Sequence, residues 1–347
     1  MNLEERISSF IILGHRINDL SQDEKLALAS QAHNQNSWFD KDSVFYALSA
    51  IQNYLDGDKL TNWLANYNIQ QLTPKRIAVI MAGNIPLVGF HDFMAVLLAG
   101  HTLYAKASTQ DSVLIRKIAK ILIEINENWK EKIIFVDGLL KDFDAIIATG
   151  SNNSARYFEQ YFGKYPHIIR KNRSSIAILS GNENTEQLAS LGGDLLQYYG
   201  LGCRNVSKIF VPINYDFIPM LDALKNWEKA MDNHKYQNNY DYNKSIYLVN
   251  RMPHLDTGFL LLTESPQLVS PISVLYYETY QDETDLLQKL SQITDDLQCI
   301  TINIHITTFT DEFTKNLINA KDLGTAQLPK LEDYADGVDT MAFLVGL

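Results

Sequence analysis

The hydrophobic pattern changes character near residue 75. Residues 1 to about 70 place apolar side chains at helical spacing, and Ser21-Gln-Asp-Glu24 has the pattern of a capping box ahead of a helix. From Arg76 onward, short apolar runs alternate with amphipathic stretches. The pattern predicts strands over residues 76–81, 102–106, 132–136 and 144–148, and helices over residues 90–99 and 109–127. This alternation is typical of a parallel, doubly wound α/β sheet.

A second α/β segment begins near residue 200. Its predicted strands lie near residues 207–211, 246–249, 258–263, 271–277 and 299–304, with helices between them. The stretch rich in Asn, Tyr and Asp at 236–243 is predicted to be a surface loop. A chain of 347 residues has the length of about two domains, and we expect the boundary between residues 198 and 199.

Composition and charge narrow the class of protein. The hydrophobic content of 46% and charged content of 20% are ordinary for a water-soluble globular protein. A net charge of −11 argues against nonspecific nucleic-acid binding. Residues 1–20 lack the pattern of a signal peptide, and the longest apolar stretch, Phe93–Ala99, is too short to span a bilayer. We therefore expect a cytoplasmic protein with no membrane span.

Cysteine usage indicates one candidate nucleophile. The chain has two cysteines and no Cys-x-x-Cys motif, so we expect neither a disulfide framework nor a metal site. Cys203 stands in Gly200-Leu-Gly-Cys-Arg-Asn205, between a helical stretch and a strand, where two glycines leave room for a substrate to reach the sulfur. The alternative is a buried structural cysteine, which is our expectation for Cys299 in an apolar run.

Three further candidates follow predicted strands of the first segment. Asn84 stands in a Gly-Asn-x-Pro run, where its amide can donate a hydrogen bond to a developing oxyanion; the alternative is a plain turn. Lys106 and Ser108 follow the next strand and suit a ribose or a phosphate, or else a solvated strand end. Gly150 and Ser151 stand at a strand-to-helix turn, whose backbone N–H groups suit a pyrophosphate.

The order of these elements resembles the aldehyde dehydrogenase superfamily. A strand precedes Asn-x-Pro, the next precedes Lys-x-Ser, a later one precedes Thr-Gly-Ser, and a cysteine follows. More closely, the chain resembles the LuxC-type long-chain acyl-CoA (acyl-protein thioester) reductases from about residue 75 to 345. The more specific matching pieces are Gly200–Ser207 and Asp333–Thr340.

The resemblance implies an aldehyde-dehydrogenase-like α/β fold with two doubly wound, Rossmann-like domains. Residues 1–198 would comprise the N-terminal helices and the nucleotide-binding domain, and residues 199–347 the catalytic domain with its C-terminal tail. By the same resemblance, the candidates take these roles: Cys203 the acyl-accepting nucleophile, Asn84 its oxyanion partner, Lys106 and Ser108 the contacts of the adenosine ribose, and Gly150 and Ser151 neighbours of the nicotinamide-side phosphates.

Departures from the superfamily pattern bear on the reaction. Hydrolytic members activate water with a glutamate, but the matching stretch His167–Ser175 contains no carboxylate. Thr109 stands where a glutamate usually binds both ribose hydroxyls, which favours NADP(H) and leaves NAD(H) open. Gln267-Leu-Val-Ser-Pro271 replaces the usual Glu-x-Phe-Gly-Pro, so the match is weaker around the nicotinamide ribose. Within the basic run 170–173, a solvated face is the ordinary interpretation and contact with CoA phosphates the alternative.

A missing water-activating base fits reduction of a thioester, because water would divert the acyl intermediate to hydrolysis. We therefore expect an acyl-CoA, acyl-carrier or acyl-protein substrate and a fatty aldehyde product. Two alternatives stay open: an aldehyde-oxidising dehydrogenase, and a non-catalytic acyl-binding protein that keeps the fold. Chain length of the acyl group and assembly into a homo-oligomer are also open.

Overall fold

The computed structural model describes the chain except for residues 70–71, 304–308, 311–312, 314–316 and 318. The described residues form two compact units, which we call unit 1 (residues 1–172 and 330–347) and unit 2 (residues 173–329). The expected boundary at 198/199 differs from this division. The chain leaves unit 1 after its fifth strand, which was not predicted, and returns to it for the last eighteen residues, 330–347.

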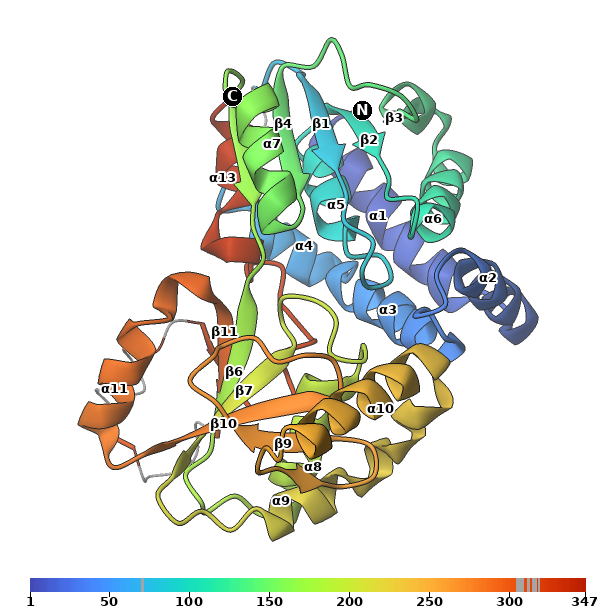
Figure 1. Cartoon of the computed structure of the whole chain (residues 1–347). Coiled ribbons are helices and arrows are strands. Elements are labelled where there is room, and N and C mark those ends of the chain that lie inside the picture. Colours follow the sequence, from blue (N-terminus) through green and yellow to red (C-terminus); the bar gives the residue numbers. More distant parts are fainter. Residues whose placement is uncertain (70–71, 304–308, 311–312, 314–316, 318) are drawn as a thin grey trace. The chain divides into compact units, whose positions relative to one another are not determined.

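Unit 1 is built on a parallel five-stranded sheet in the order β3-β2-β1-β4-β5 (Figure 1). Its strands are β1 (Arg76–Ile80), β2 (Thr102–Lys106), β3 (Ile133–Phe135), β4 (Ala145–Thr149) and β5 (His167–Arg170). Between them lie α5 (Phe90–Leu98), α6 (Ser112–Ile125), the 3-10 turn η1 (Glu127–Glu131) and α7 (Asn152–Phe162). The predicted parallel α/β sheet is confirmed, although α6 begins three residues later than predicted.

Alternate residues of the central strand explain the two layers around this sheet. In β1, Ile77 and Val79 join the large core that includes residues of α5 and α6. Ala78 faces the other way and packs with Phe158 and Phe162 of α7. Because both faces are covered, the strand is apolar at successive positions, as expected for a buried parallel sheet.

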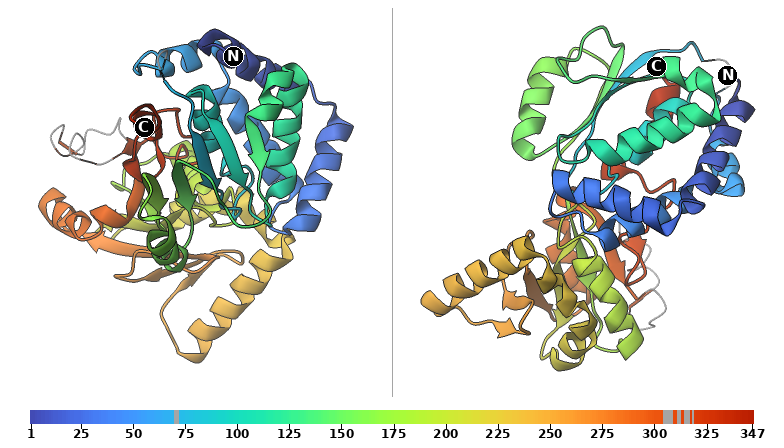
Figure 2. Two further views of the ribbon diagram at one scale, coloured as in Figure 1. Left: turned by 90° about the horizontal axis from the view of Figure 1, so that it is seen from above. Right: turned by 90° about the vertical axis from the view of Figure 1, so that its right-hand side faces the viewer.

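The N-terminal helices complete the large core of unit 1, as the helical pattern predicts. They are α1 (Leu3–Asn18), α2 (Gln22–Gln35), α3 (Lys41–Tyr54) and α4 (Gly57–Leu64). The expected capping box of α2 is present: the Ser21 side chain accepts from Glu24 N–H, and the Glu24 carboxylate accepts from Ser21 N–H. Helix α1 packs against α6 along the face of the sheet that α5 also covers (Figure 2).

The returning segment 330–347 is part of the core of unit 1. It contains the 3-10 turn η4 (Ala335–Gly337) and the short helix α13 (Thr340–Val345), which contacts α5. The Tyr334 hydroxyl accepts a hydrogen bond from Trp63 Nε1 at 2.7 Å and lies 2.6 Å from the Tyr67 hydroxyl. His101 Nε2 lies 2.9 Å from the carbonyl oxygen of Leu344. These contacts fix the tail onto helices and loops from the first hundred residues.

Unit 2 contains a seven-stranded sheet in the order β12-β11-β6-β7-β10-β9-β8, parallel except for β8. Its strands are β6 (Ser174–Ile178), β7 (Val206–Pro212), β8 (Leu255–Asp256), β9 (Leu261–Glu264), β10 (Val274–Tyr280), β11 (Leu297–Ile302) and β12 (Ala320–Lys321). The other elements are α8 (Thr185–Leu196), α9 (Ile218–Ala223), η2 (Leu224–Asp232), α10 (His234–Val249), α11 (Glu283–Ser291) and η3 (Thr294–Asp296). The predicted strand near 299–304 corresponds to β11, and its last residue lies outside the described residues.

Two expectations for unit 2 were wrong at the same place. The stretch 236–243 is not a loop and 246–249 is not a strand, because both belong to the helix α10. Its buried side chains are Tyr236, Tyr240, Asn243 and Tyr247, which recur at helical spacing. Tyrosine therefore supplies the buried face of this helix, and a count of aliphatic residues does not detect it.

None of the helices in the described part of the chain is long and apolar enough to cross a membrane.

Candidate functional site

The candidate residues of unit 1, predicted for the oxyanion and for the nucleotide, all lie at the carboxyl ends of its strands. The loop with Asn84 follows β1, Lys106 ends β2, and Gly150 and Ser151 follow β4. Strands β1 and β4 are neighbours at the centre of the sheet, and the chain order reverses between them. Open α/β sheets bind ligands at this edge beside such a reversal. The structure thus brings these candidates to one edge of one sheet.

The loop that contains Asn84 is held by the buried side chain of Asp111. Asn84 itself is exposed. Three residues later, Leu87 has a left-handed backbone (φ 58°), and its N–H donates a hydrogen bond of 2.6 Å to Oδ2 of Asp111. Asp111, which precedes α6, is only 5% exposed. Desolvation by burial raises the pKa of the Asp111 carboxyl to about 8, although the bond from Leu87 opposes the shift.

A second buried side chain holds the other end of this loop. Asn36, which follows α2, donates from Nδ2 to the carbonyl oxygen of Gly83 at 3.2 Å. Gly83 also lies against Ser108, since a Cβ at Gly83 would stand 2.5 Å from Oγ of Ser108 and 2.6 Å from its Cβ. Glycine is therefore required for close packing of the β1 and β2 loops. Asn84 lies between two anchored positions.

The Lys106–Ser108 segment has the polarity that a ribose or phosphate contact needs. Lys106 is half-buried, and its Nζ donates to the carbonyl oxygen of Gly138 in the loop after β3. Ser108 is half-buried, and its Oγ accepts from the N–H of Gln110 at 3.1 Å. Thr109 is exposed. A nucleotide at this edge would meet a lysine and two hydroxyl groups without a carboxylate at residue 109.

Helix α7 presents its N-terminus at the same edge. Ser151 is its N-cap and accepts from the N–H of Ser154 at 3.2 Å. The first turn of α7 has no acidic side chain, so its backbone N–H groups can receive an anion. Gly150 lies close to the helix, because a Cβ there would stand 2.8 Å from Cβ of Ser154.

The basic run at the end of β5 is partly internal. Arg170 ends β5 and is 4% exposed, so the expectation of a solvated face is wrong for this residue. Its guanidinium makes a bidentate ion pair with Asp92 of α5, with 2.9 Å between Nη2 and Oδ1. Nη2 also donates to Thr340 Oγ1 in the tail at 2.9 Å. Arg170 therefore ties the edge strand to α5 and α13 instead of facing a ligand.

Cys203 belongs to unit 2, on the loop between α8 and β7. Three residues before it have left-handed backbones: Tyr199 (φ 59°), Gly200 (φ 82°) and Gly202 (φ 97°). Glycine adopts this conformation without the steric cost that a side chain brings. Cys203 is half-buried, whereas Cys299 in β11 is buried, and the two form no disulfide. Cys203 is therefore the more accessible of the two thiols.

Ser175 connects the surroundings of both cysteines. Its Oγ donates to the carbonyl oxygen of Cys203 at 3.0 Å and lies 3.1 Å from Sγ of Cys299. Burial raises the pKa of the Cys299 thiol. A raised pKa disfavours the thiolate, which is the nucleophilic form. Cys299 thus fits the structural role expected of it.

The Cys203 loop precedes β7, and the loop of residues 265–273 precedes the neighbouring strand β10. Both loops therefore lie at the amino-terminal edge of the unit 2 sheet. Ser207 Oγ donates to the carbonyl oxygen of Leu268 at 2.8 Å, and Lys208 Nζ donates to that of Pro266 at 3.1 Å. Gln267, which replaces the usual glutamate, is exposed between these two anchored carbonyls.

Sequence reasoning missed the supports of these loops. Asn36, Asp111 and Ser175 are ordinary polar residues whose partners lie 24 to 47 positions away in the sequence. Asp111 directly before a helix is the one signal that was available, as Asp is a common N-cap, yet its side chain makes no capping bond here. Among the described residues, no group of His, Cys, Asp and Glu side chains is arranged to hold a metal ion.

Comparisons with known proteins identify the family and the fold. The family described as acyl-CoA reductase (LuxC) matches residues 22–215. No curated protein matches the chain. An NAD+ complex of an aldehyde dehydrogenase from Bacillus cereus superposes with a TM-score of 0.65 at 13% identity, covering 91% of this chain and 75% of that one. Betaine aldehyde dehydrogenase from Staphylococcus aureus, also with NAD+, gives 0.66 at 12% identity, covering 92% and 74%. The predicted aldehyde-dehydrogenase-like fold is confirmed.

Proposed function

The chain belongs to the LuxC family of acyl-CoA reductases, and on that premise we propose that it reduces acyl thioesters to aldehydes through an acyl group carried on Cys203. The observation that carries this proposal is the position of Cys203: inside the matched segment, half-buried, on a loop with left-handed residues. The substrate would be an acyl-CoA or a thioester on a carrier protein, and the product a fatty aldehyde.

The thiolate of Cys203 would attack the thioester carbonyl. A carbon–sulfur bond to Cys203 forms, and the bond to the departing thiol breaks, so one thioester replaces another. Hydride addition to the acyl carbon gives a thiohemiacetal on Cys203. Its collapse breaks the bond to Cys203, releasing the aldehyde and regenerating the thiol. The matching stretch His167–Ser175 offers no carboxylate to activate water, which would favour reduction over hydrolysis.

We assign Asn84 to the oxyanion that develops on the acyl carbonyl. Its loop is fixed at Gly83 and Leu87 by buried partners, as a preorganised donor requires.

The hydride would come from a reduced nicotinamide dinucleotide bound to unit 1. The residues at the carboxyl edge fit such a group: α7 offers its N-terminus without an acidic side chain, and Gly150 and Ser151 lie beside it. Lys106 and Ser108 would bind the adenosine ribose. We favour NADPH over NADH because residue 109 is a threonine, so no carboxylate there would repel a 2′-phosphate.

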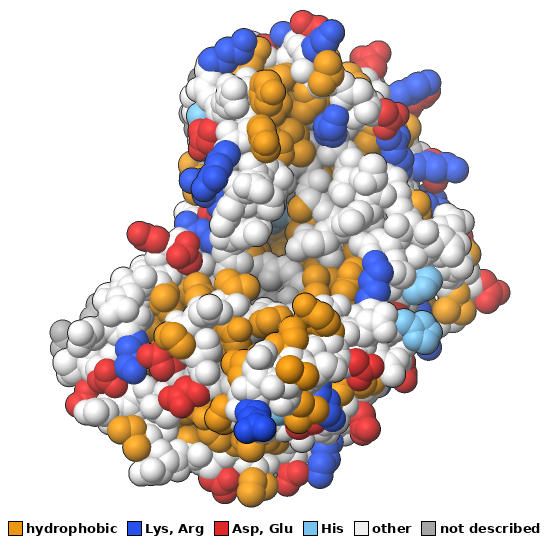
Figure 3. Space-filling model, in the orientation of Figure 1, with side chains coloured by type: hydrophobic (Ala, Val, Ile, Leu, Met, Phe, Trp, Pro, Cys, Tyr) orange, Lys and Arg blue, Asp and Glu red, His pale blue; other side chains and the backbone are white. Residues whose placement is uncertain are grey.

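We also propose that the protein assembles with a second copy of itself. Apolar side chains gather on the face of unit 2 that carries α10 and the β8–β10 edge (Figure 3). Val249 is 81% exposed and Leu248 60%, and the edge strand β8 begins with the exposed Leu255. Exposed apolar surface beside an edge strand favours association.

The proposed reaction needs Cys203 as a reduced thiol. We therefore expect the protein in the cytoplasm, which keeps thiols reduced.

Product analysis tests the function directly. The protein is incubated with acyl-CoAs of graded chain length and NADPH, while aldehyde, free CoA and oxidised nucleotide are measured. The proposal expects the three to appear in equal amounts. Release of CoA together with a carboxylic acid would mean hydrolysis, and oxidation of a supplied aldehyde without any thioester reduction would favour an ordinary dehydrogenase. If the protein neither reduces the thioester nor oxidises the aldehyde, and forms no acyl adduct, it would be a non-catalytic binder.

A further inference from the structure

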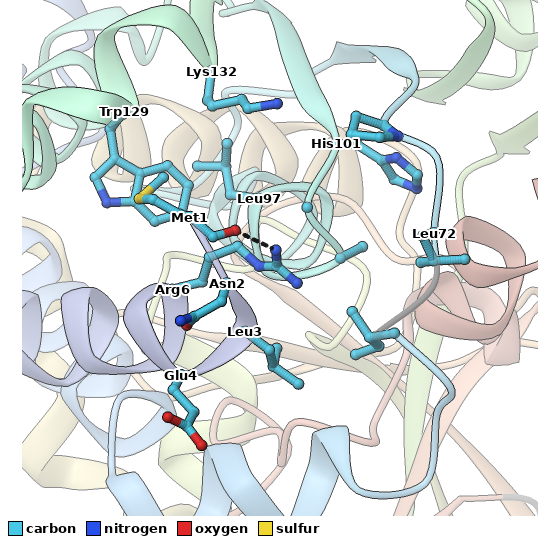
Figure 4. Close-up of a pocket in the computed structure, with 14 residues that line it drawn as sticks. Met1, Asn2, Leu3, Glu4, Arg6, Leu72, Leu97, His101, Trp129 and Lys132 are labelled. Carbon is cyan, nitrogen blue, oxygen red and sulfur yellow. Dashed lines mark hydrogen bonds between the residues drawn. The ribbon is translucent and has the colours of Figure 1, made fainter.

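A cavity of about 590 Å³ lies at the opposite, amino-terminal edge of the unit 1 sheet (Figure 4). Its lining comes from the start of α1, the end of α5 with the turn Gly100–His101, and residues just before β1 and β3. The candidate nucleotide-binding residues follow the carboxyl ends of the strands, so the cavity is separate from them. Its volume is in the range of small-molecule pockets, about 300–1,000 Å³.

One part of the wall is apolar. Leu97 and Trp129 line the cavity and are at most 1% exposed, and the half-buried Leu3 lines it from the first turn of α1. The Trp129 ring is fixed from behind by an edge contact with Phe10, with 5.7 Å between ring centroids. An apolar group placed here would be removed from water against rigid side chains.

The other part of the wall is cationic. The side chains of Arg6 and Lys132 extend toward the same open space, with His101 beyond them (Figure 4). Arg6 is oriented by bonds from Nε to the carbonyl oxygen of Leu98 at 3.0 Å and from Nη1 to that of Met1 at 3.1 Å. Gly100 gives it room, since a Cβ there would stand 2.9 Å from Nη1. Nη2 makes no hydrogen bond to any described residue.

His101 does not neutralise these cations. Its Nδ1 accepts from Lys75 N–H at 3.1 Å, so Nε2 carries the proton and donates to the carbonyl oxygen of Leu344 at 2.9 Å. Burial lowers the pKa of His101, and the charges of Arg6, Lys132 and Lys75 lower it further. Arg6 and Lys132 therefore line the cavity together with a neutral imidazole.

Acidic side chains do not neutralise them either. Within the described residues, Arg6, Lys75 and Lys132 form no ion pair with a carboxylate, and burial alone accounts for the lowered pKa of Arg6. Glu4 also lines the cavity, but its carboxylate points away from Arg6 and Lys132 (Figure 4). A half-buried cation is costly without a counter-charge, so the cavity favours an anion.

We propose that this cavity binds an amphiphilic organic anion, with its charged head between Arg6 and Lys132 and its apolar body along Leu97 and Trp129. The cationic side chains alone would attract any anion, and the apolar wall alone would bind any apolar molecule. Selectivity for an amphiphilic anion requires both. The inference does not depend on Cys203 or on the proposed reaction.

Calorimetric titration of the full chain with three probes tests the pairing of charge and apolar wall. Octanoate has both features, 1-octanol has only the chain, and inorganic phosphate has only the charge. Octanoate is expected to bind more tightly than either of the others by about tenfold or more, since each lacks one set of contacts. Equal binding of phosphate and octanoate, or no octanoate binding, would overturn the proposal.

Matched variants test the site. Lys132→Glu should weaken octanoate binding by about tenfold, because it replaces an attraction with a repulsion. Lys130→Glu makes the same change on an exposed neighbour that does not line the cavity, and should leave the affinity nearly unchanged. Arg6→Met, which keeps a long side chain, gives a second reading if Lys132→Glu unfolds. An affinity that none of these variants alters would place the ligand elsewhere and overturn the proposal.

Amide hydrogen exchange then locates the ligand. Octanoate should protect the start of α1 and the segment from Leu97 to His101. Protection confined to the loop around Cys203 would show that octanoate occupies the proposed acyl site, which would overturn this inference and leave the proposed function standing.

Discussion

The loops that carry Asn84 and Cys203 are held in two different ways. The Asn84 loop is anchored at both ends by buried side chains from distant segments, Asn36 and Asp111. The Cys203 loop is anchored by Ser175, and left-handed residues stand next to the cysteine. The contacts that hold the first loop can be seen only in the folded structure. The glycines of the second loop can be recognised in the sequence as Gly200-Leu-Gly202. A substitution should therefore act at long range in the first loop and locally in the second.

The largest effect on activity is expected from replacing Cys203. With acyl-CoA and no reduced nucleotide, intact-mass measurement should show one acyl group on the protein. Cys203→Ala should abolish this adduct and all turnover, because no other nucleophile is proposed. Cys299→Ala is the matched control and should keep the adduct, since Cys299 is buried in β11. An adduct that maps to Cys299 would reverse the assignment.

Asn84→Ala should reduce kcat by about 10²–10³, the usual effect of removing one oxyanion donor. Nucleotide affinity should be nearly unchanged, which calorimetric titration with NADPH would measure alongside turnover. If the variant instead loses nucleotide affinity with kcat intact, Asn84 is a cofactor contact.

Asp111 tests the long-range support of the Asn84 loop. Asp111→Ala leaves the Leu87 N–H without its acceptor and should cost about 1–3 kcal/mol of stability, together with part of the turnover. Asp111→Asn retains an acceptor oxygen and should keep most of both. Chemical denaturation of the two variants measures the difference, and equal losses would mean that the bond to Leu87 does not hold the loop.

The stability of the parent relative to Asp111→Asn should depend on pH, and the direction of the change follows from the raised pKa of Asp111. Asp111 holds its proton up to about pH 8 in the folded chain, whereas an unfolded aspartate releases it near pH ~4. The parent should therefore lose stability relative to Asp111→Asn as the pH rises from about 4 to about 8, with no further loss above that. A difference that is constant across this range would contradict the raised pKa.

Two glycines separate the effects of packing and backbone strain. Gly83→Ala creates contacts of 2.5 and 2.6 Å with Ser108, and the substitution Ser108→Gly should rescue its thermal stability. Gly200→Ala meets nothing closer than Asn205 Nδ2 at 3.7 Å, so its cost should come from the φ of 82° alone, about 1–2 kcal/mol. Rescue of Gly200→Ala by a change at a neighbour would show that space, not backbone, limits that position.

The smallest effect expected is on cofactor choice. Thr109→Glu should shift the affinity ratio toward NADH by a few-fold only, because interactions of an exposed charge are worth on the order of 1 kcal/mol. Titration of both nucleotides against parent and variant measures this ratio. Thr109→Gln is the uncharged control, and a ratio that changes equally in both would exclude a charge effect.

The sequence predicted what depends on local pattern. The central strand β1 of unit 1 is an apolar run with both faces covered, and the strand ends of this sheet carry the candidate loops with Asn84, Lys106 and Gly150 as expected. Strands β5 and β6 were not predicted. In β6 the buried Ser174 and Ser175 interrupt the apolar pattern, and their partners Ser207 and Cys299 lie 33 and 124 positions away. Hydrogen bonds at such separations leave no periodic signal.

The supports of the candidate site were hidden for the same reason. Asp111 and Arg170 look like surface charges in the sequence, yet they are 5% and 4% exposed. Arg170 is buried together with the opposite charge of Asp92, whereas burial raises the pKa of the Asp111 carboxyl to about 8. The candidate residues themselves stand in short runs such as Gly-Asn-x-Pro and Gly-x-Gly-Cys, so the local sequence was enough to predict them.

The return of residues 330–347 to unit 1 has a consequence for how the protein is made. Leu331, Tyr334, Met341 and Leu344 belong to the same core as the first helices, more than two hundred residues earlier. During translation, unit 2 is complete in the nascent chain before this core can close. Until residues 330–347 are synthesised, unit 1 keeps part of its apolar core surface uncovered. Incompletely folded nascent chains with exposed apolar surface are prone to aggregate and to need chaperones.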